Sequence, residues 1–131
     1  MNRPLRLLLC ALLATTALAA CQPRDFGGVP YPIGELHFPI TITPTPDQRF
    51  ALVANANFNL EYRAGALAVL DVERNVVIEG RGVEIGNFAG EVALYSRQGV
   101  PVRAFVPVRE DDSIVMVDVS TDPDDGSPVL T

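Results

Sequence analysis

The sequence predicts an all-β domain that follows a short N-terminal targeting segment. From Glu35 onward, no run of ten or more residues spaces its apolar side chains at the intervals of three and four that a helix requires. The chain instead alternates short apolar stretches with clusters of Gly, Pro, Asn and Asp, which is typical of antiparallel sheets. With 131 residues, 48% of them hydrophobic and 20% charged, the chain has the size of one ordinary domain and is too apolar for intrinsic disorder.

The first twenty residues have the order of a secretory signal peptide. Arg3 and Arg6 supply a positive start, and residues 7–17 form an uncharged apolar stretch. This stretch is shorter than the roughly 20 residues that a membrane-spanning helix needs. We therefore expect residues 1–20 to direct export and to be removed.

The segment Leu18-Ala19-Ala20-Cys21 resembles the lipobox of bacterial lipoproteins, in which small residues precede a cysteine at the end of the apolar stretch. The resemblance implies that a signal peptidase recognises Leu18, Ala19 and Ala20 and cuts before Cys21, whose sulfur carries a diacylglycerol. Since two or more acyl chains anchor a protein stably, the expected location is a membrane surface of the cell envelope. Gln22 stands where an aspartate would favour the inner membrane, so the resemblance implies the outer membrane. An ordinary cleavage site followed by a chance cysteine is the alternative.

Charge and cysteine content exclude several classes of protein. Removal of residues 1–20 would leave 111 residues with eight arginines, no lysine and sixteen acidic residues. Such a chain is poorly suited to the phosphate backbone, so we expect no nucleic-acid partner. The two cysteines, Cys10 and Cys21, and the single histidine give no basis for a disulfide framework or a zinc module. We expect neither a cofactor nor a metal ion.

Residues 21–34 are expected to form the lipidated cysteine and a tether. The segment after Gln22 contains three prolines and three glycines, a composition that disfavours a helix or a central strand. The domain is therefore expected to cover residues 35–131.

Eight strands are expected in this domain. In chain order they are Leu36–Thr43, Arg49–Asn55, Ala66–Val72, Val76–Ile78, Val83–Ile85, Glu91–Tyr95, Val102–Val108 and Ser113–Val119. Each is bounded by turn residues, such as the two prolines within Pro44–Asp47 and the acidic turn Glu110–Asp112. The acidic segment Asp122–Gly126 is expected to be a polar loop, because it lacks the distal glutamate of a calcium loop.

Two of the expected hairpins resemble each other. Each consists of an apolar strand, a polar turn and a second strand that ends in an apolar-Asp-Val sequence. We expect Arg49–Asn55 to pair with Ala66–Val72, and Val102–Val108 to pair with Ser113–Val119. Asp71 and Asp118 lie 47 residues apart, and a repeat of this length corresponds to one four-stranded propeller blade.

The repeat resembles the blades of YVTN-type β-propellers. Leu52-Val53-Ala54-Asn55 with Val69-Leu70-Asp71 matches one blade, and Phe105-Val106-Pro107-Val108 with Met116-Val117-Asp118 matches the next. Val108 replaces the expected asparagine, and Pro107 removes a hydrogen-bond donor from the ladder. The resemblance implies antiparallel four-stranded blades, about one full blade and part of a second. Because a propeller needs at least four blades, it also implies the N-terminal part of a longer protein; a small β-sandwich is the alternative.

Candidate interaction residues lie in the loop Asn55–Arg63. Its Phe58, Tyr62 and Arg63 are of the types that dominate interface energies, although the loop could equally be a self-packed hairpin tip. We expect Asp71 and Asp118 to have a repeated structural role, such as accepting backbone N–H groups in the turn that follows each strand.

No catalytic constellation is visible in the sequence. The only histidine, His37, is expected to be solvated on the polar side of a strand, and no serine lies in a G-x-S-x-G context. We therefore expect a binding or interaction module rather than an enzyme, with the membrane as one partner and a protein or envelope ligand as another. The alternative is the N-terminal part of a quinoprotein-like or lactonase-like propeller enzyme whose active site lies outside this chain.

Overall fold

The computed structural model describes residues 28–131; the predicted lipobox, Leu18 to Cys21, lies outside the described residues. Residues 28–131 contain nine β-strands and no helix, and so no helix that could span a membrane. The strands are β1 (Pro39–Pro44), β2 (Phe50–Asn55), β3 (Gly65–Asp71), β4 (Val76–Val77), β5 (Val83–Ile85), β6 (Ala93–Arg97), β7 (Val100–Val108), β8 (Ser113–Thr121) and β9 (Pro128–Leu130). The predicted all-β class is confirmed.

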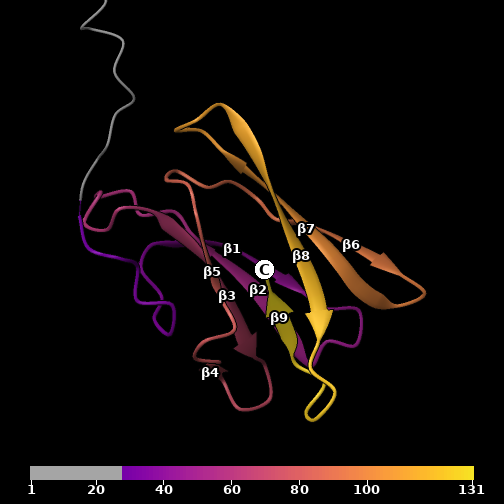
Figure 1. Cartoon of the computed structure of the whole chain (residues 1–131). Helices are drawn as coiled ribbons and strands as arrows, with labels where there is room; N and C mark the ends of the chain where they lie inside the picture. The colour runs from indigo at the N-terminus through magenta and orange to yellow at the C-terminus, as the bar shows by residue number, and fades with distance from the viewer. Residues whose placement is uncertain (1–27) are drawn as a thin grey trace, which may run out of the picture.

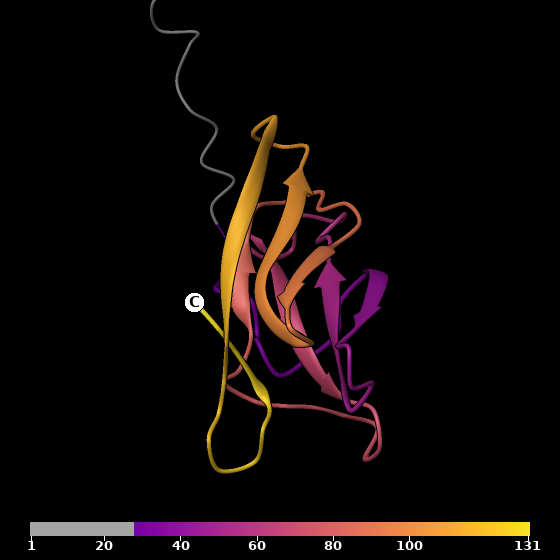
Figure 2. The ribbon, with the colours of Figure 1, turned by 90° about the vertical axis from the view of Figure 1, so that its right-hand side faces the viewer.

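The strands form two antiparallel sheets (Figure 1). The first has the order β1-β2-β3-β4, and β5 pairs with the half of β3 that β4 leaves free. The second has the order β6-β7-β8-β9. In the view of Figure 2, the orange and yellow strands of the second sheet lie in front of the magenta strands of the first.

The two expected hairpins are present and share one register. Six residue pairs join β2 to β3, from Phe50 opposite Asp71 to Asn55 opposite Ala66. Six pairs also join β7 to β8, from Arg103 opposite Asp118 to Val108 opposite Ser113. Asp71 and Asp118 therefore occupy equivalent positions.

The end of the chain forms a strand that the sequence pattern did not indicate. The expectation that the second sheet has only three strands is wrong, because β9 pairs with β8 as its fourth strand. Three residues are too few for an alternation to be recognised, but Leu130 is buried, and Thr131 exchanges backbone hydrogen bonds with Asp118. The segment 122–126 turns between β8 and β9, with the Gly126 N–H donating to the Asp122 carbonyl.

One hydrophobic core lies between the sheets, and the two hairpins meet in it through opposite faces. Cross-strand partners share a face, so the register gives each residue of one hairpin an equivalent in the other. Leu52 and Leu67 belong to the core, whereas their equivalents Phe105 and Ile114 point away from it. The second hairpin instead contributes the alternate residues of its strands, including Val106. The two hairpins therefore contact each other through non-equivalent faces, an arrangement that we call head-to-tail. In a two-fold symmetric sandwich, the equivalent faces of the two hairpins would contact each other instead.

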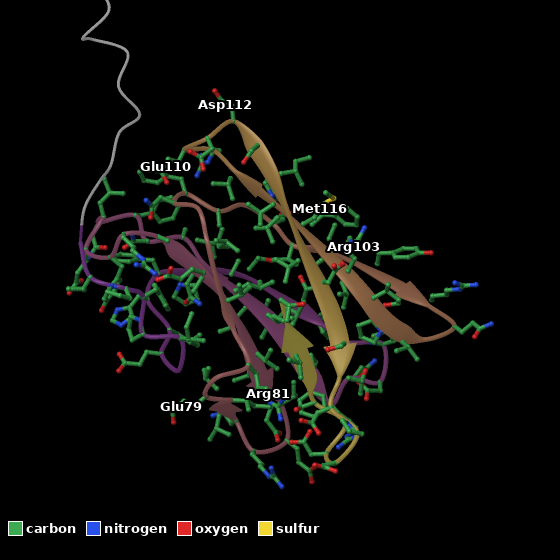
Figure 3. All side chains as sticks on the ribbon, in the orientation of Figure 1. Glu79, Arg81, Arg103, Glu110, Asp112 and Met116 are labelled. Carbon is green, nitrogen blue, oxygen red and sulfur yellow. The ribbon has the colours of Figure 1, made fainter. Side chains whose placement is uncertain are left out.

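The head-to-tail packing leaves one face of the second sheet uncovered, which we call the outer face. Its residues are Tyr95, Arg103, Phe105, Ile114, Met116 and Asp118. Ile114 is 65% exposed and Met116 63% exposed. Figure 3 shows Met116 and Arg103 on the side of β7 and β8 that faces away from the first sheet.

The segment before β1 covers the face of the first hairpin that points away from the core. The Tyr31 N–H donates to Glu84 Oε1 at 2.9 Å, and the His37 N–H donates to Asn55 Oδ1 at 3.1 Å. Glu84 and Asn55 both pair with Ala66, which lies on this face. Residues 28–34 were predicted to be part of a tether, but Tyr31 is almost completely buried. His37 lies before β1 and not on a strand, which corrects its expected position.

Candidate interaction surface

Loops from both sheets meet at the end of the molecule where residue 28 joins the domain (Figure 1). Backbone hydrogen bonds link them in series. The Ala56 N–H donates to the Phe38 carbonyl at 3.1 Å, and the Phe88 N–H donates to the Ala56 carbonyl at 2.8 Å. The Arg109 N–H donates in turn to the Phe88 carbonyl at 3.4 Å. These bonds hold four loops in fixed relative positions.

Three aromatic side chains from these loops form what we call the phenylalanine platform: Phe38, Phe58 and Phe88. The ring centroid of Phe58 lies 6.5 Å from that of Phe38 and 5.9 Å from that of Phe88. Arg109 places its guanidinium 6.0 Å from the Phe58 ring centre, within cation–π range. Phe38 is 47% exposed and Phe58 43% exposed, so the platform presents apolar area to its surroundings.

Two platform residues adopt an unusual backbone conformation. Phe38 has a φ of 52° and Phe88 a φ of 55°, in the left-handed region that bulky side chains rarely occupy. Such a conformation costs on the order of 1–3 kcal/mol, and residues that adopt it cluster at functional sites. The same region is occupied by six other non-glycine residues of the described part of the chain, among them Gln48 and Leu60, so the conformation is not confined to the platform.

Two buried asparagines, Asn57 and Asn87, form hydrogen bonds next to the platform residues Phe58 and Phe88. The Asn57 side chain donates to Asn87 Oδ1 at 2.6 Å and to the Tyr62 carbonyl at 2.7 Å, and its own Oδ1 accepts the Tyr62 N–H at 3.2 Å. The Asn87 N–H donates to a Glu110 carboxylate oxygen at 2.9 Å. Both asparagine side chains are fully buried, which fixes the loop that carries Phe58.

A second aromatic cluster, formed by Tyr31, His37 and Tyr62, lies in the same region. Its three ring centroids are 4.9–5.8 Å apart. The Tyr62 hydroxyl lies 3.2 Å from His37 Nε2, which also contacts Glu35 Oε2 at 3.1 Å. Burial raises the pKa of the Tyr31 hydroxyl, and loss of hydration raises the pKa of Tyr62. These hydroxyls therefore act as neutral hydrogen-bonding groups at ordinary pH.

Arg63 is held by an ion pair instead of pointing away from the loop. Its Nη2 lies 2.7 Å from Glu84 Oε2, and its Nε lies 3.1 Å from the same oxygen. The hydrogen bonds from Arg63, together with the Tyr31 N–H, hold the pKa of Glu84 below its ordinary range. Of the three interaction residues predicted from the sequence, Phe58 is exposed in the platform and Tyr62 contacts His37. Arg63 pairs with Glu84, but its side chain is still 54% exposed.

The platform as a whole was not recognisable from the sequence. Phe38 precedes β1 and Phe88 follows β5, so only the fold brings them to Phe58. The one usable signal was the run ANANFN around Asn57, because asparagine is the polar residue that most readily adopts a positive φ.

The two repeated aspartates have different contacts. Asp71 Oδ1 accepts the Arg74 N–H at 2.9 Å, as expected for a turn-capping residue. It also lines a hollow of about 220 Å³ together with Arg49 and Asp125. Asp118 accepts the Arg103 guanidinium at 2.7 Å on the outer face. Among residues 28–131, no group of three His, Cys, Asp or Glu side chains is placed to hold a metal ion.

No family model matches the sequence, and no curated protein or solved structure matches it significantly. The structure itself shows an all-β fold of two antiparallel sheets.

Proposed function

We propose that the chain is a lipid-anchored protein of the cell envelope, more specifically of the outer membrane, that acts as a binding or interaction module. The anchor is Cys21, preceded by the recognition residues Leu18, Ala19 and Ala20. An uncharged apolar stretch that ends in small residues and a cysteine supports this assignment.

The outer face of the second sheet is the proposed interaction surface, and one observation carries the proposal. Residues at the same register positions in the first hairpin, such as Leu67 and Val69, are completely buried against a neighbouring sheet. Their equivalents Ile114 and Met116 are exposed. Head-to-tail packing can be repeated, so the outer face is suited to a further sheet of the same kind.

A propeller-like repeat is the form of assembly that we propose. In this proposal the five-stranded and the four-stranded sheet correspond to successive blades, and a further sheet of the same kind covers the outer face. Residues 29–38 would then act as the cap of the first unit, since a stack of repeats needs a polar or covered terminal face.

Thiol accessibility tests the proposed interaction surface. In the mature chain the only native cysteine would be lipidated, so a Met116→Cys variant carries one free thiol on the outer face. We expect this thiol to be protected from a maleimide in the native envelope. A Val76→Cys variant, at a half-exposed position on β4, is the matched control and should react freely. Equal labelling of both variants in the envelope would contradict the proposal.

A further inference from the structure

We infer that the phenylalanine platform rests on the surface of the lipid bilayer. This inference relies on the anchoring at Cys21 that is proposed above. It adds that the domain has a fixed orientation at the membrane, with Phe38 and Phe58 in contact with lipid.

The first argument is the short distance that the anchor allows. Gly28 is the seventh residue after Cys21, and a chain of seven steps spans at most about 25 Å. The nine residues of β7 alone extend over about 30 Å, so the tether is no longer than the domain. The end of the molecule that carries Gly28 is therefore the end held near the membrane.

The second argument is that Gly28 is fixed against the loop that carries Phe58. Gly28 has a φ of 100°, and a Cβ atom at this position would lie 3.1 Å from the Arg63 backbone nitrogen. The next residue, Val29, accepts the Arg63 N–H at 3.0 Å and forms a bridge with Tyr62. The chain thus leaves the domain beside the platform.

The third argument is the chemistry of this end. Besides Phe38 and Phe58, the nearby Val29 and Leu36 are exposed. Aromatic rings with an adjacent arginine are favoured at the boundary between headgroups and acyl chains, where the ring is buried and the cation stays hydrated. Phe38, one of the exposed rings, also has a φ of 52°, a conformation that costs stability in a bulky residue. Contact with lipid offers a reason for that cost.

Charge selects the type of bilayer. The tip of the β7–β8 hairpin carries Glu110, Asp111 and Asp112 at the same end of the molecule (Figure 3). These acids repel anionic lipids, so a zwitterionic surface is the appropriate probe.

Tryptophan fluorescence tests the inference, because the chain contains no tryptophan. The full chain is expressed in a lipoprotein-processing host as a Phe58→Trp variant and reconstituted in phosphatidylcholine vesicles that contain brominated lipid. The matched control is Tyr95→Trp on β6, far from Gly28 in Figure 1. We expect quenching of the Phe58→Trp variant to exceed that of the control by about twofold or more. Unfolding midpoints of both variants show that each is folded.

The mass of the same preparation separates the two proposals. A lipidated chain in which both tryptophans are quenched equally, or not at all, would overturn the platform inference and leave the anchor intact. A chain without lipid would overturn the anchor and, with it, the inference. If the Phe58→Trp side chain is shielded in the native envelope but not in vesicles, its partner is a protein and the inference is wrong.

Discussion

Asp71 and Asp118 occupy the same register position in two equivalent hairpins, but they lie on opposite sides relative to the core. Asp71 pairs with Phe50 on the core-facing side and is only 8% exposed. Asp118 pairs with Arg103 on the outer face. This difference follows from the head-to-tail packing, because the face that the first hairpin buries in the core is equivalent to the face that the second hairpin leaves exposed.

The two aspartates should therefore differ in their effect on stability. Asp71→Ala removes the carboxylate that accepts the part-buried Arg74 N–H, and loss of this charge-assisted hydrogen bond should lower the free energy of unfolding by about 1–3 kcal/mol. Asp118→Ala removes an exposed ion pair and should cost at most about 1 kcal/mol. Urea unfolding of both variants measures the difference, and equal losses would contradict the assigned faces.

Equivalent apolar residues provide a second comparison. Leu67→Ala opens a cavity in the core and should lower the free energy of unfolding by about 2–5 kcal/mol. Ile114→Ala, at the equivalent position on the outer face, should change it by no more than about 0.5 kcal/mol in the isolated chain. A large loss for Ile114→Ala would show that this side chain is buried.

Replacement of a strained platform residue should separate stability from membrane contact. Phe38→Gly and Phe38→Ala both remove the half-exposed ring, but only glycine adopts the positive φ freely, so Phe38→Gly should be more stable than Phe38→Ala by up to about 1 kcal/mol. Either change should reduce the contact of the domain with vesicles. Phe58→Ala, where the structure records no positive φ, is the control and should reduce contact without stabilising the domain. A Phe38→Ala variant that is as stable as Phe38→Gly would remove the argument from strain.

The pair between Glu84 and Arg63 should make stability depend on pH. Because the pKa of Glu84 is lowered in the folded state, the unfolded chain binds this proton first as the pH falls. The stabilisation is thus complete above the ordinary glutamate pKa of about 4.3 and is lost as the pH falls through the lowered value.

Unfolding free energies measured between about pH 6 and pH 3 test this linkage. The difference between the native sequence and Glu84→Gln should shrink as the pH decreases. The same substitution at Glu79, an exposed residue near β4, is the matched control (Figure 3). A difference for Glu84→Gln that is constant with pH would contradict the pairing.

Local patterns in the sequence predicted much of the fold. The alternation in Val102–Val108 and Ser113–Val119, and the turn residues between them, gave both the strands and their pairing. The burial of Tyr31 was not predictable, because proline and glycine around it suggest a spacer, and its partner Glu84 lies 53 residues away in the sequence. The sequence also could not tell which of two alternate faces, Ile114 or Val117, points outward, because both are apolar.

The candidate site was predictable only in part. Phe58 was recognised from its own loop, whereas Phe38, Phe88 and Arg109 come from segments that are joined by backbone hydrogen bonds across the fold. Arg63 has the residue type of an interface anchor, but Glu84, 21 residues away, holds its guanidinium. The residue type of Arg63 is visible in the sequence, whereas its pairing with Glu84 depends on the fold.

The proposal that this domain works at a membrane surface is tested most directly at its N-terminus. Mass spectrometry of the chain purified from the membrane fraction should find that it begins at Cys21, with a diacylglycerol on the sulfur. A Cys21→Ser variant should accumulate as precursor and incorporate no lipid. An unmodified N-terminus at any other residue would contradict the account.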